Sequence, residues 1–160
     1  MDERDGRLLR RVADYQFGRG AGTALFPVGA DLEVTHTGSG RPRQVIGPAG
    51  RRATYGTSGR LTLGIAGGRR LLAGLEPPAH RIEVGTESEP YVREGRNVFA
   101  KFVDVADEAV RPRDDVLVVH EDGGLLAVGR ARLSGAEMRS FASGVAVQVR
   151  EGAGPADERA

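Results

Sequence analysis

The chain has 160 residues, of which 39% are hydrophobic and only 5% aromatic, so it can form one domain or two small ones with thin cores. It contains no cysteine, which excludes disulfides, thiolate metal sites and a cysteine nucleophile and fits a cytoplasmic protein. The first ten residues are charged where a signal peptide would be apolar, and no run of about 18 apolar residues occurs. We therefore expect a cytoplasmic protein that does not interact with membranes.

The net charge of +1 hides an uneven distribution along the chain. Residues 1–85 carry 13 arginines and 8 carboxylates, a net charge of +5, whereas residues 86–160 carry 9 arginines and one lysine against 14 carboxylates, a net charge of −4. Residues 34–75 contain seven arginines and no acidic residue. A GC-rich genome favours arginine over lysine, but it does not explain the missing acids. Because the guanidinium group suits phosphate contacts, the first half is expected to attract nucleic acid.

Hydrophobic periodicity predicts a helix over residues 5–16, whose apolar face consists of Leu8, Leu9, Val12 and Tyr15. Residues 21–26 predict a further helical turn that ends at Pro27. Short segments with strand periodicity, separated by glycine-bearing turns, then follow at residues 32–36, 44–46, 52–55 and 60–65. A helix over residues 66–75 completes a predicted α+β module.

Two successive prolines, Pro77 and Pro78, stop this helix and place the first domain at residues 1–78. The sequence then predicts strands at residues 80–84, 98–104, 115–120, 124–132 and 145–150, with short helices at residues 88–94 and 135–141. Many short strands with tight turns favour a barrel or a mixed sheet, so residues 79–150 form the second predicted domain. Residues 151–160, rich in Gly, Pro, Ala and charge, are expected to be a disordered tail.

The segment from Glu89 to Phe102, EPYVREGRNVFAKF, combines a short helix, a glycine turn and a strand. Gly95 permits close approach of a ligand to the backbone, and Arg96 and Lys101 can neutralise phosphates. Asn97 offers both a donor and an acceptor to a base edge or a 2′-hydroxyl. An ordinary polar turn has the same composition, so the residues alone leave both interpretations open.

This segment resembles the start of a PUA domain, the small RNA-binding barrel of pseudouridine synthases and archaeosine transglycosylases, in its archaeal branch. The run PRDDVLVVHEDGGLLAVGRARLSGAEMRSFASGVAVQVR at residues 112–150 follows the later strands of that family. The run ADYQFGRGAGTALF at residues 13–26 is similar to the opening of the pre-PUA module of archaeosine tRNA-guanine transglycosylases. The resemblance implies an α+β fold, with an N-terminal helix/sheet module followed by a PUA-like pseudo-barrel.

The resemblance also implies RNA binding, with tRNA as the expected partner. The residues that it assigns to the glycine turn and the last strand are Arg93, Gly95, Arg96, Asn97, Lys101, Gln148 and Arg150. The acid-free stretch adds a second expected contact surface, made of Arg41, Arg43, Arg51 and Arg52. Aromatic residues are few there, so phosphate contacts to a folded RNA are expected to outweigh base stacking. Whether these arginines share one face is not decided by the sequence.

We therefore expect an RNA-binding protein that acts alone or as the detached RNA-binding part of a tRNA-modification enzyme. It is expected not to be an enzyme, because the transglycosylase barrel would need a far longer chain. The alternative is a non-catalytic subunit that docks a tRNA-modifying enzyme through its acidic half and contacts RNA weakly. No metal or cofactor is expected, since the three histidines lie 40 or more residues apart and the paired acids fall at predicted turns.

Overall fold

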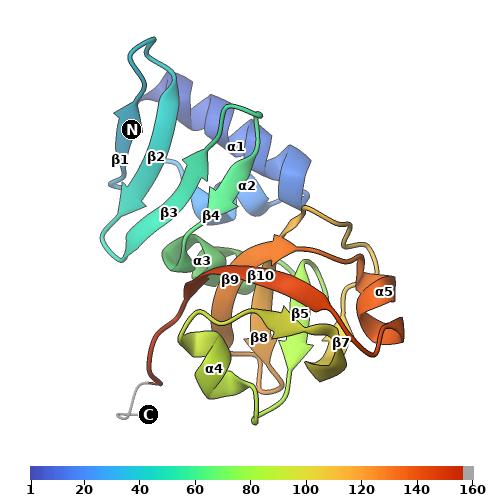
Figure 1. Ribbon diagram of the computed structural model, residues 1–160. Helices are drawn as coiled ribbons and strands as arrows, with labels where there is room; N and C mark the ends of the chain where they lie inside the picture. The colour runs from blue at the N-terminus through green and yellow to red at the C-terminus, as the bar shows by residue number, and fades with distance from the viewer. Residues whose placement is uncertain (157–160) are drawn as a thin grey trace. The chain divides into compact units, whose positions relative to one another are not determined.

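The computed structural model describes residues 1–156, and the chain divides into two compact units after Glu76 (Figure 1). The division falls two residues before the expected boundary at residue 78. Each unit has its own sheet, of four strands in the first unit and six in the second.

The first unit begins with α1 (Glu3–Phe17), which is capped by the Asp2 carboxylate through a hydrogen bond of 2.8 Å from the Asp5 amide. Its core face consists of Leu9, Ala13 and Phe17, which follow one another at intervals of four residues and are buried. The expected apolar face was wrong in part, because Leu8 and Tyr15 are exposed. Ala13 and Phe17 occupy the core positions that these side chains were expected to fill.

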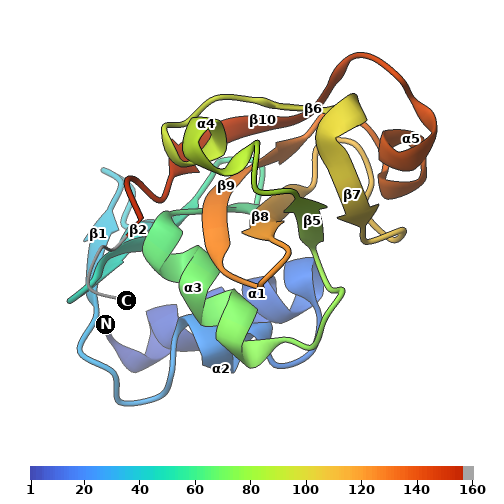
Figure 2. The ribbon, with the colours of Figure 1, turned by 90° about the horizontal axis from the view of Figure 1, so that it is seen from below.

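A short helix, α2 (Ala21–Leu25), packs side by side with α1 (Figure 2). The two helices approach closely because Gly22 has no side chain, and a Cβ atom there would overlap the backbone of Arg10. The carboxylate of Asp14 accepts a hydrogen bond of 2.7 Å from the Gly22 amide and ties the second helix to the first. The glycine-rich connection therefore serves helix packing.

The sheet of the first unit is antiparallel, and its strands lie side by side in chain order. They are β1 (Glu33–His36), β2 (Pro42–Gly47), β3 (Gly50–Tyr55) and β4 (Leu61–Leu63). Val45, Ala53 and Leu63 pair across β2, β3 and β4, and all three are fully buried. This row forms the sheet's contribution to the core. The helix α3 (Ile65–Gly74) follows β4 and packs on β3.

Within residues 77–156, the second unit has one mixed sheet and three short helical segments. Its elements are β5 (Arg81–Val84), α4 (Glu89–Arg93), β6 (Val98–Phe99), the 3-10 turn η1 (Ala100–Phe102), β7 (Val103–Ala106), β8 (Asp115–His120), β9 (Leu125–Ala131), α5 (Gly135–Ser140) and β10 (Val145–Gly152). The strand order is β6-β10-β9-β8-β5-β7; β5 and β8 pair in parallel, and the other neighbouring strands of this order pair antiparallel.

The sheet of the second unit is almost closed, because its two edge strands, β6 and β7, are joined directly by η1. The expected single strand over residues 98–104 is therefore wrong. Val98 and Phe99 pair with β10, whereas residues 103–106 pair with β5 at the other end of the sheet. The enclosed core contains Ile82, Val84 and Leu126, all fully buried. This barrel-like arrangement confirms the predicted fold class.

The last strand extends further than expected. Glu151 and Gly152 continue the pairing of β10 with β9, and the amide of Ala153 donates to the Leu126 carbonyl over 2.8 Å. The expectation of a disordered tail from residue 151 is therefore wrong for these residues, because their backbone groups are satisfied by the sheet. Residues 157–160 of that tail lie outside the described part. Among residues 1–156, no helix has the length and hydropathy needed to cross a membrane.

Candidate nucleic-acid interface

The glycine turn follows α4 directly and is held in a conformation that favours glycine. The Gly95 amide donates to the Val92 carbonyl over 2.9 Å, and the Arg96 amide donates to the Tyr91 carbonyl over 3.1 Å. Gly95 has a φ of +99°, which residues with a side chain rarely adopt. A Cβ atom at this position would meet no atom within 4 Å, so the space beside the turn is open to a ligand.

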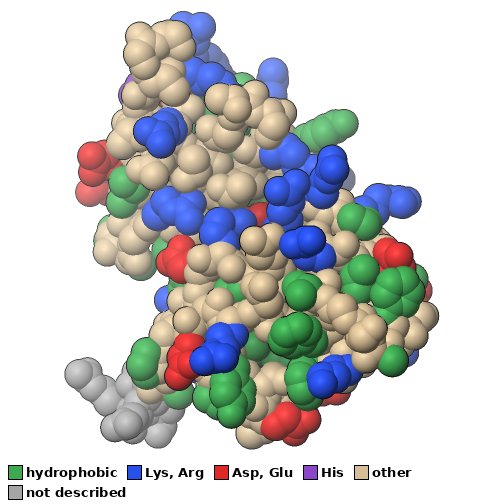
Figure 3. Space-filling model, in the orientation of Figure 1, with side chains coloured by type: hydrophobic (Ala, Val, Ile, Leu, Met, Phe, Trp, Pro, Cys, Tyr) green, Lys and Arg blue, Asp and Glu red, His purple; other side chains and the backbone are tan. Residues whose placement is uncertain are grey.

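A groove of about 440 Å³ runs beside this turn. Residues of α4 and of the segment before it, the turn, β6 and η1 line it, namely Glu87, Ser88, Tyr91, Val92, Arg96, Asn97, Val98, Phe99 and Phe102. Its three aromatic side chains are exposed although they are large and apolar, and Tyr91 keeps 57% of its accessible surface. Figure 3 shows hydrophobic side chains on this face of the second unit, with basic side chains among them. The aromatic character of this site was missed in the sequence, where Phe99 and Phe102 were taken only as part of a strand pattern.

Two cations lie next to the aromatic rings of the groove. The Arg96 guanidinium lies 6.0 Å from the centre of the Tyr91 ring, and the Lys101 ammonium lies 5.1 Å from that of Phe102. Arg96 also approaches the Glu94 carboxylate at 3.9 Å, but both side chains are largely exposed and such a pair contributes little. The groove thus combines aromatic faces with exposed positive charges, which suits bases and their phosphates.

The side chain of Asn97 fastens the turn to the last strand. Its carbonyl oxygen accepts a hydrogen bond of 3.0 Å from the amide of Val149 in β10. Its amide hydrogens and the second lone pair of that oxygen remain for a base edge or a ribose. Gln148, the preceding residue of β10, is exposed and accepts a hydrogen bond of 3.3 Å from the Arg132 guanidinium.

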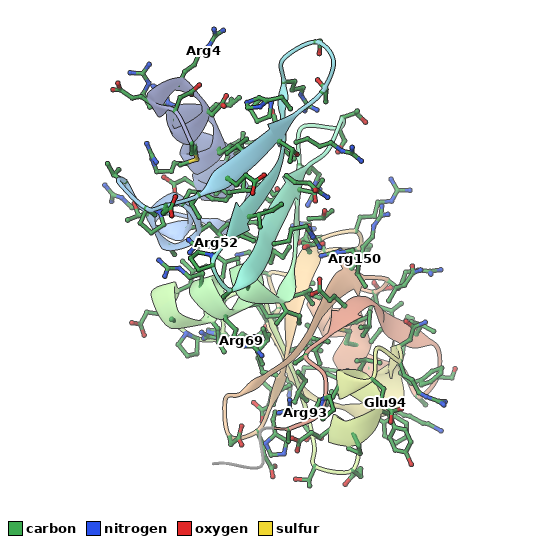
Figure 4. The ribbon with its side chains drawn as sticks, turned by 90° about the vertical axis from the view of Figure 1, so that its left-hand side faces the viewer. Arg4, Arg52, Arg69, Arg93, Glu94 and Arg150 are labelled. Carbon is green, nitrogen blue, oxygen red and sulfur yellow. The ribbon has the colours of Figure 1, made fainter. Side chains whose placement is uncertain are left out.

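Arg93 and Arg150, two of the expected RNA contacts, are engaged within the protein. Arg93 donates to the Glu89 carboxylate over 3.0 Å and to the Gly154 carbonyl over 3.3 Å, which links α4 to the residues after β10. Arg150 forms a two-pronged pair with Asp115, at 2.9 and 2.8 Å (Figure 4 labels both arginines). These contacts give both arginines a structural role, and their expected contact with RNA stays a prediction.

The acid-free stretch does not form one free basic surface. Arg52 keeps only 8% of its accessible surface and donates to the Leu25 carbonyl over 2.9 Å (Figure 4). Burial, and secondarily the nearby Arg70, lowers its pKa from the usual arginine value. The guanidinium of Arg51 donates to the Thr54 hydroxyl over 3.0 Å and to two carbonyls of β4. Arg51 and Arg52 therefore have partners within the first unit, and their assignment as phosphate contacts stays a prediction.

The other two arginines of this set lie at the surface. Arg41 stacks on the Tyr55 ring with its guanidinium carbon 4.0 Å from the ring centre, and it donates to the Gly56 carbonyl. The Arg43 side chain is exposed and makes no hydrogen bond or ion pair within residues 1–156. Of the four expected contacts in the first unit, Arg43 alone is both exposed and unengaged in that part of the chain. The described residues contain no group of three or more His, Asp or Glu able to hold a metal ion.

Comparisons with known proteins match each unit to a family. Residues 7–78 match the family model of the patch-forming domain C2 of tRNA-guanine transglycosylase, and residues 80–153 match that of the PUA domain. The tRNA-guanine(15) transglycosylase of Pyrococcus furiosus is 49% identical over 145 residues, which cover 90% of this chain and 24% of the relative. The corresponding enzyme of Thermoplasma acidophilum is 43% identical, with 90% and 23% covered. The chain spans about a quarter of the length of these curated relatives.

Solved structures share the fold. A hypothetical protein of Pyrococcus horikoshii superposes with a TM-score of 0.70 at 20% identity, covering 96% of this chain and 92% of that chain. A conserved PUA domain protein from Thermoplasma acidophilum superposes with a TM-score of 0.58 at 21% identity, covering 94% and 93%. These likenesses confirm the expected fold, in which a helix/sheet module is followed by a PUA-like barrel.

Proposed function

We propose that this chain, which belongs to the PUA-domain proteins and carries a C2 domain of the tRNA-guanine transglycosylase type ahead of its PUA domain, binds RNA. The observation that carries the proposal is the aromatic groove beside Gly95. Tyr91, Phe99 and Phe102 leave apolar faces in water, which is costly unless another molecule covers them. Unpaired bases are flat and stack well on such faces.

The charges around the groove favour RNA over an apolar peptide. Arg96 and Lys101 lie beside aromatic rings, where they can neutralise the phosphates that flank a stacked base. The open space at Gly95 lets the sugar-phosphate backbone approach the protein backbone. The amide hydrogens of Asn97 then supply a polar contact to a base edge or a 2′-hydroxyl. The volume of the groove is suited to one nucleotide.

We infer further that the RNA is a tRNA and that the protein itself is not an enzyme. The relatives over nearly the whole chain are tRNA-guanine(15) transglycosylases, of which this chain matches about a quarter. A protein with these two domains would hold a tRNA for a modification enzyme that acts as its partner. Such a role needs binding surfaces only, and it is consistent with a protein located in the cytoplasm.

The proposal is tested by removing the two exposed cations of the groove in the full chain. Each lost contact between a cation and RNA costs about 1–3 kcal/mol, so Arg96→Ala/Lys101→Ala should weaken tRNA binding by on the order of tenfold or more. The melting temperature should stay near that of the wild type, because both side chains are exposed. Arg111→Ala/Arg139→Ala removes two exposed cations of the same unit outside the groove and serves as the control.

The docking-subunit alternative makes the opposite prediction. In that case the Arg96→Ala/Lys101→Ala variant would bind tRNA as well as the wild type, and the glycine turn would be only a structural connection. A tRNA affinity reduced equally by the two double variants would also contradict the proposal, because it would show a general effect of net charge.

A further inference from the structure

An acidic side chain lines the aromatic groove of the second unit. Glu87 is exposed, and its carboxylate makes no hydrogen bond or ion pair within residues 1–156. Such a carboxylate repels the phosphates of an RNA that enters the groove, so it weakens binding unless it contacts the ligand directly. An ionised carboxylate only accepts hydrogen bonds, and the ligand group that suits this position is therefore a hydrogen-bond donor.

A second polar group in the wall of the groove also has no partner in the described part of the chain. Ser88 keeps only 9% of its accessible surface and precedes α4, but its hydroxyl makes no capping bond to the helix. The hydroxyl makes no other hydrogen bond within residues 1–156. Because buried hydroxyls are usually hydrogen-bonded, this position favours contact with a polar group of a bound ligand.

The four bases of RNA differ in the donors that they present to such a wall. Guanine carries two adjacent donors, N1–H and the N2 amino group, which match the two oxygens of a carboxylate. Adenine and cytosine each present one amino group, and uracil presents one N–H between two carbonyl oxygens that a carboxylate repels. The amide hydrogens of Asn97, which lines the same groove, can donate to the O6 atom of guanine.

We infer that the groove beside Gly95 prefers an unpaired guanine, whose N1–H and N2 amino group donate to the carboxylate of Glu87 while the base stacks on an aromatic ring of the groove. This inference rests on the proposed function and adds a base specificity to it. The Ser88 hydroxyl supplies a further polar contact to the same base. The preference arises because a base without matching groups leaves the polar atoms of the groove unpaired.

The experiment measures dissociation constants of the full chain for short oligouridylates in which one central base is guanine, adenine, cytosine or uracil. The guanine oligomer should bind about 5- to 150-fold more tightly than the uracil oligomer, as for one bidentate contact to a base edge. Glu87→Gln keeps the size of the side chain but only one acceptor oxygen, so this ratio should fall toward one. Ser88→Ala should weaken binding of the guanine oligomer about 2- to 10-fold without lowering the melting temperature, because the hydroxyl has no partner within residues 1–156.

Asp104→Asn is the matched control. The carboxyl groups of Glu87 and Asp104 lie 3.8 and 3.3 Å from the position that a Cβ atom of Gly85 would occupy, and both residues are exposed. Asp104 is not among the described residues that line the groove. Its replacement removes a negative charge close to that of Glu87, so it should strengthen binding of all four oligomers alike and leave the ratio between guanine and uracil unchanged.

Several results would overturn the inference while RNA binding itself stands. They are equal affinity of the wild type for the four oligomers, a guanine preference that survives Glu87→Gln, and an equal loss of that preference in Glu87→Gln and Asp104→Asn. Binding of tRNA without binding of any oligomer would also overturn it, because the groove would then accept no unpaired guanine. If neither tRNA nor any oligomer binds, the proposed function fails as well.

Discussion

Replacement of Arg150 by alanine should destabilise the PUA domain. Its guanidinium makes two hydrogen bonds to Asp115, whose side chain is only 6% exposed, whereas that of Arg150 is 30% exposed. Breaking a buried ion pair costs about 3–5 kcal/mol, and we expect about 2–3 kcal/mol here because water can reach the carboxylate from the side of Arg150. With the urea dependence typical of a small protein, this loss lowers the unfolding midpoint by about 1–2 M.

The assay is urea unfolding followed by circular dichroism, with tRNA affinity measured on the same proteins below their transition. Arg139→Ala, which removes an exposed ion pair with Glu108, should change the free energy of unfolding by no more than about 0.5 kcal/mol. The reasoning would be refuted if Arg150→Ala unfolded at the wild-type urea concentration while binding tRNA more weakly. In that case Arg150 would be an RNA contact, as its position on the last strand suggested.

Two further predictions concern turns of the PUA domain. Gly95→Ala should cost about 1–2 kcal/mol in unfolding free energy, because the φ of +99° strains any L-residue; an unchanged urea midpoint would contradict this reason. The pKa of Asp122 is lowered, chiefly by the hydrogen bond from the Gly124 amide, so its stabilising effect is complete above the ordinary value of 3.8 and lost as the pH falls through the lowered value. The stability difference between wild type and Asp122→Asn should therefore shrink in acid, and a constant difference from neutral pH to about pH 2 would refute it.

Most secondary-structure elements were predictable because their signals are local. Prolines, glycine turns and the period of the apolar residues located the helices and strands of both units to within a few residues. The division of residues 98–106 between two edges of the sheet was not predictable in this way. The apolar and polar residues alternate on both sides of η1, and only the pairing with β10 and β5 shows that the chain changes edges there.

The orientation of individual side chains depended on residues far away in the sequence. Leu8 and Tyr15 have the same helical spacing as true core residues, and α2 and β4, which pack on α1, decide which face is buried. Arginine composition for Arg52, and the family resemblance for Arg150, likewise suggested RNA contacts at positions where the structure provides internal partners. Arg52 bonds a carbonyl 27 residues away and Arg150 a carboxylate 35 residues away, and neither contact has a local signal.

The aromatic groove of the PUA domain shows the same limit. Tyr91 precedes the glycine turn, and Phe99 and Phe102 follow it at positions where a regular strand would turn one of them inward. The 3-10 turn at residues 100–102 instead leaves both rings exposed beside Tyr91. The glycine and the cations beside this groove were singled out from the sequence, but its exposed aromatic surface required the fold.

Ultraviolet cross-linking of the full chain to bound tRNA, followed by mass spectrometry of the cross-linked peptides, tests the central claim most directly. Bases stacked on aromatic rings should cross-link efficiently, so we predict adducts at Tyr91, Phe99 or Phe102. These adducts should diminish in the Arg96→Ala/Lys101→Ala variant. Specific tRNA binding with cross-links only at residues outside 87–102 would contradict the assignment of the groove as the RNA-binding site of the PUA domain.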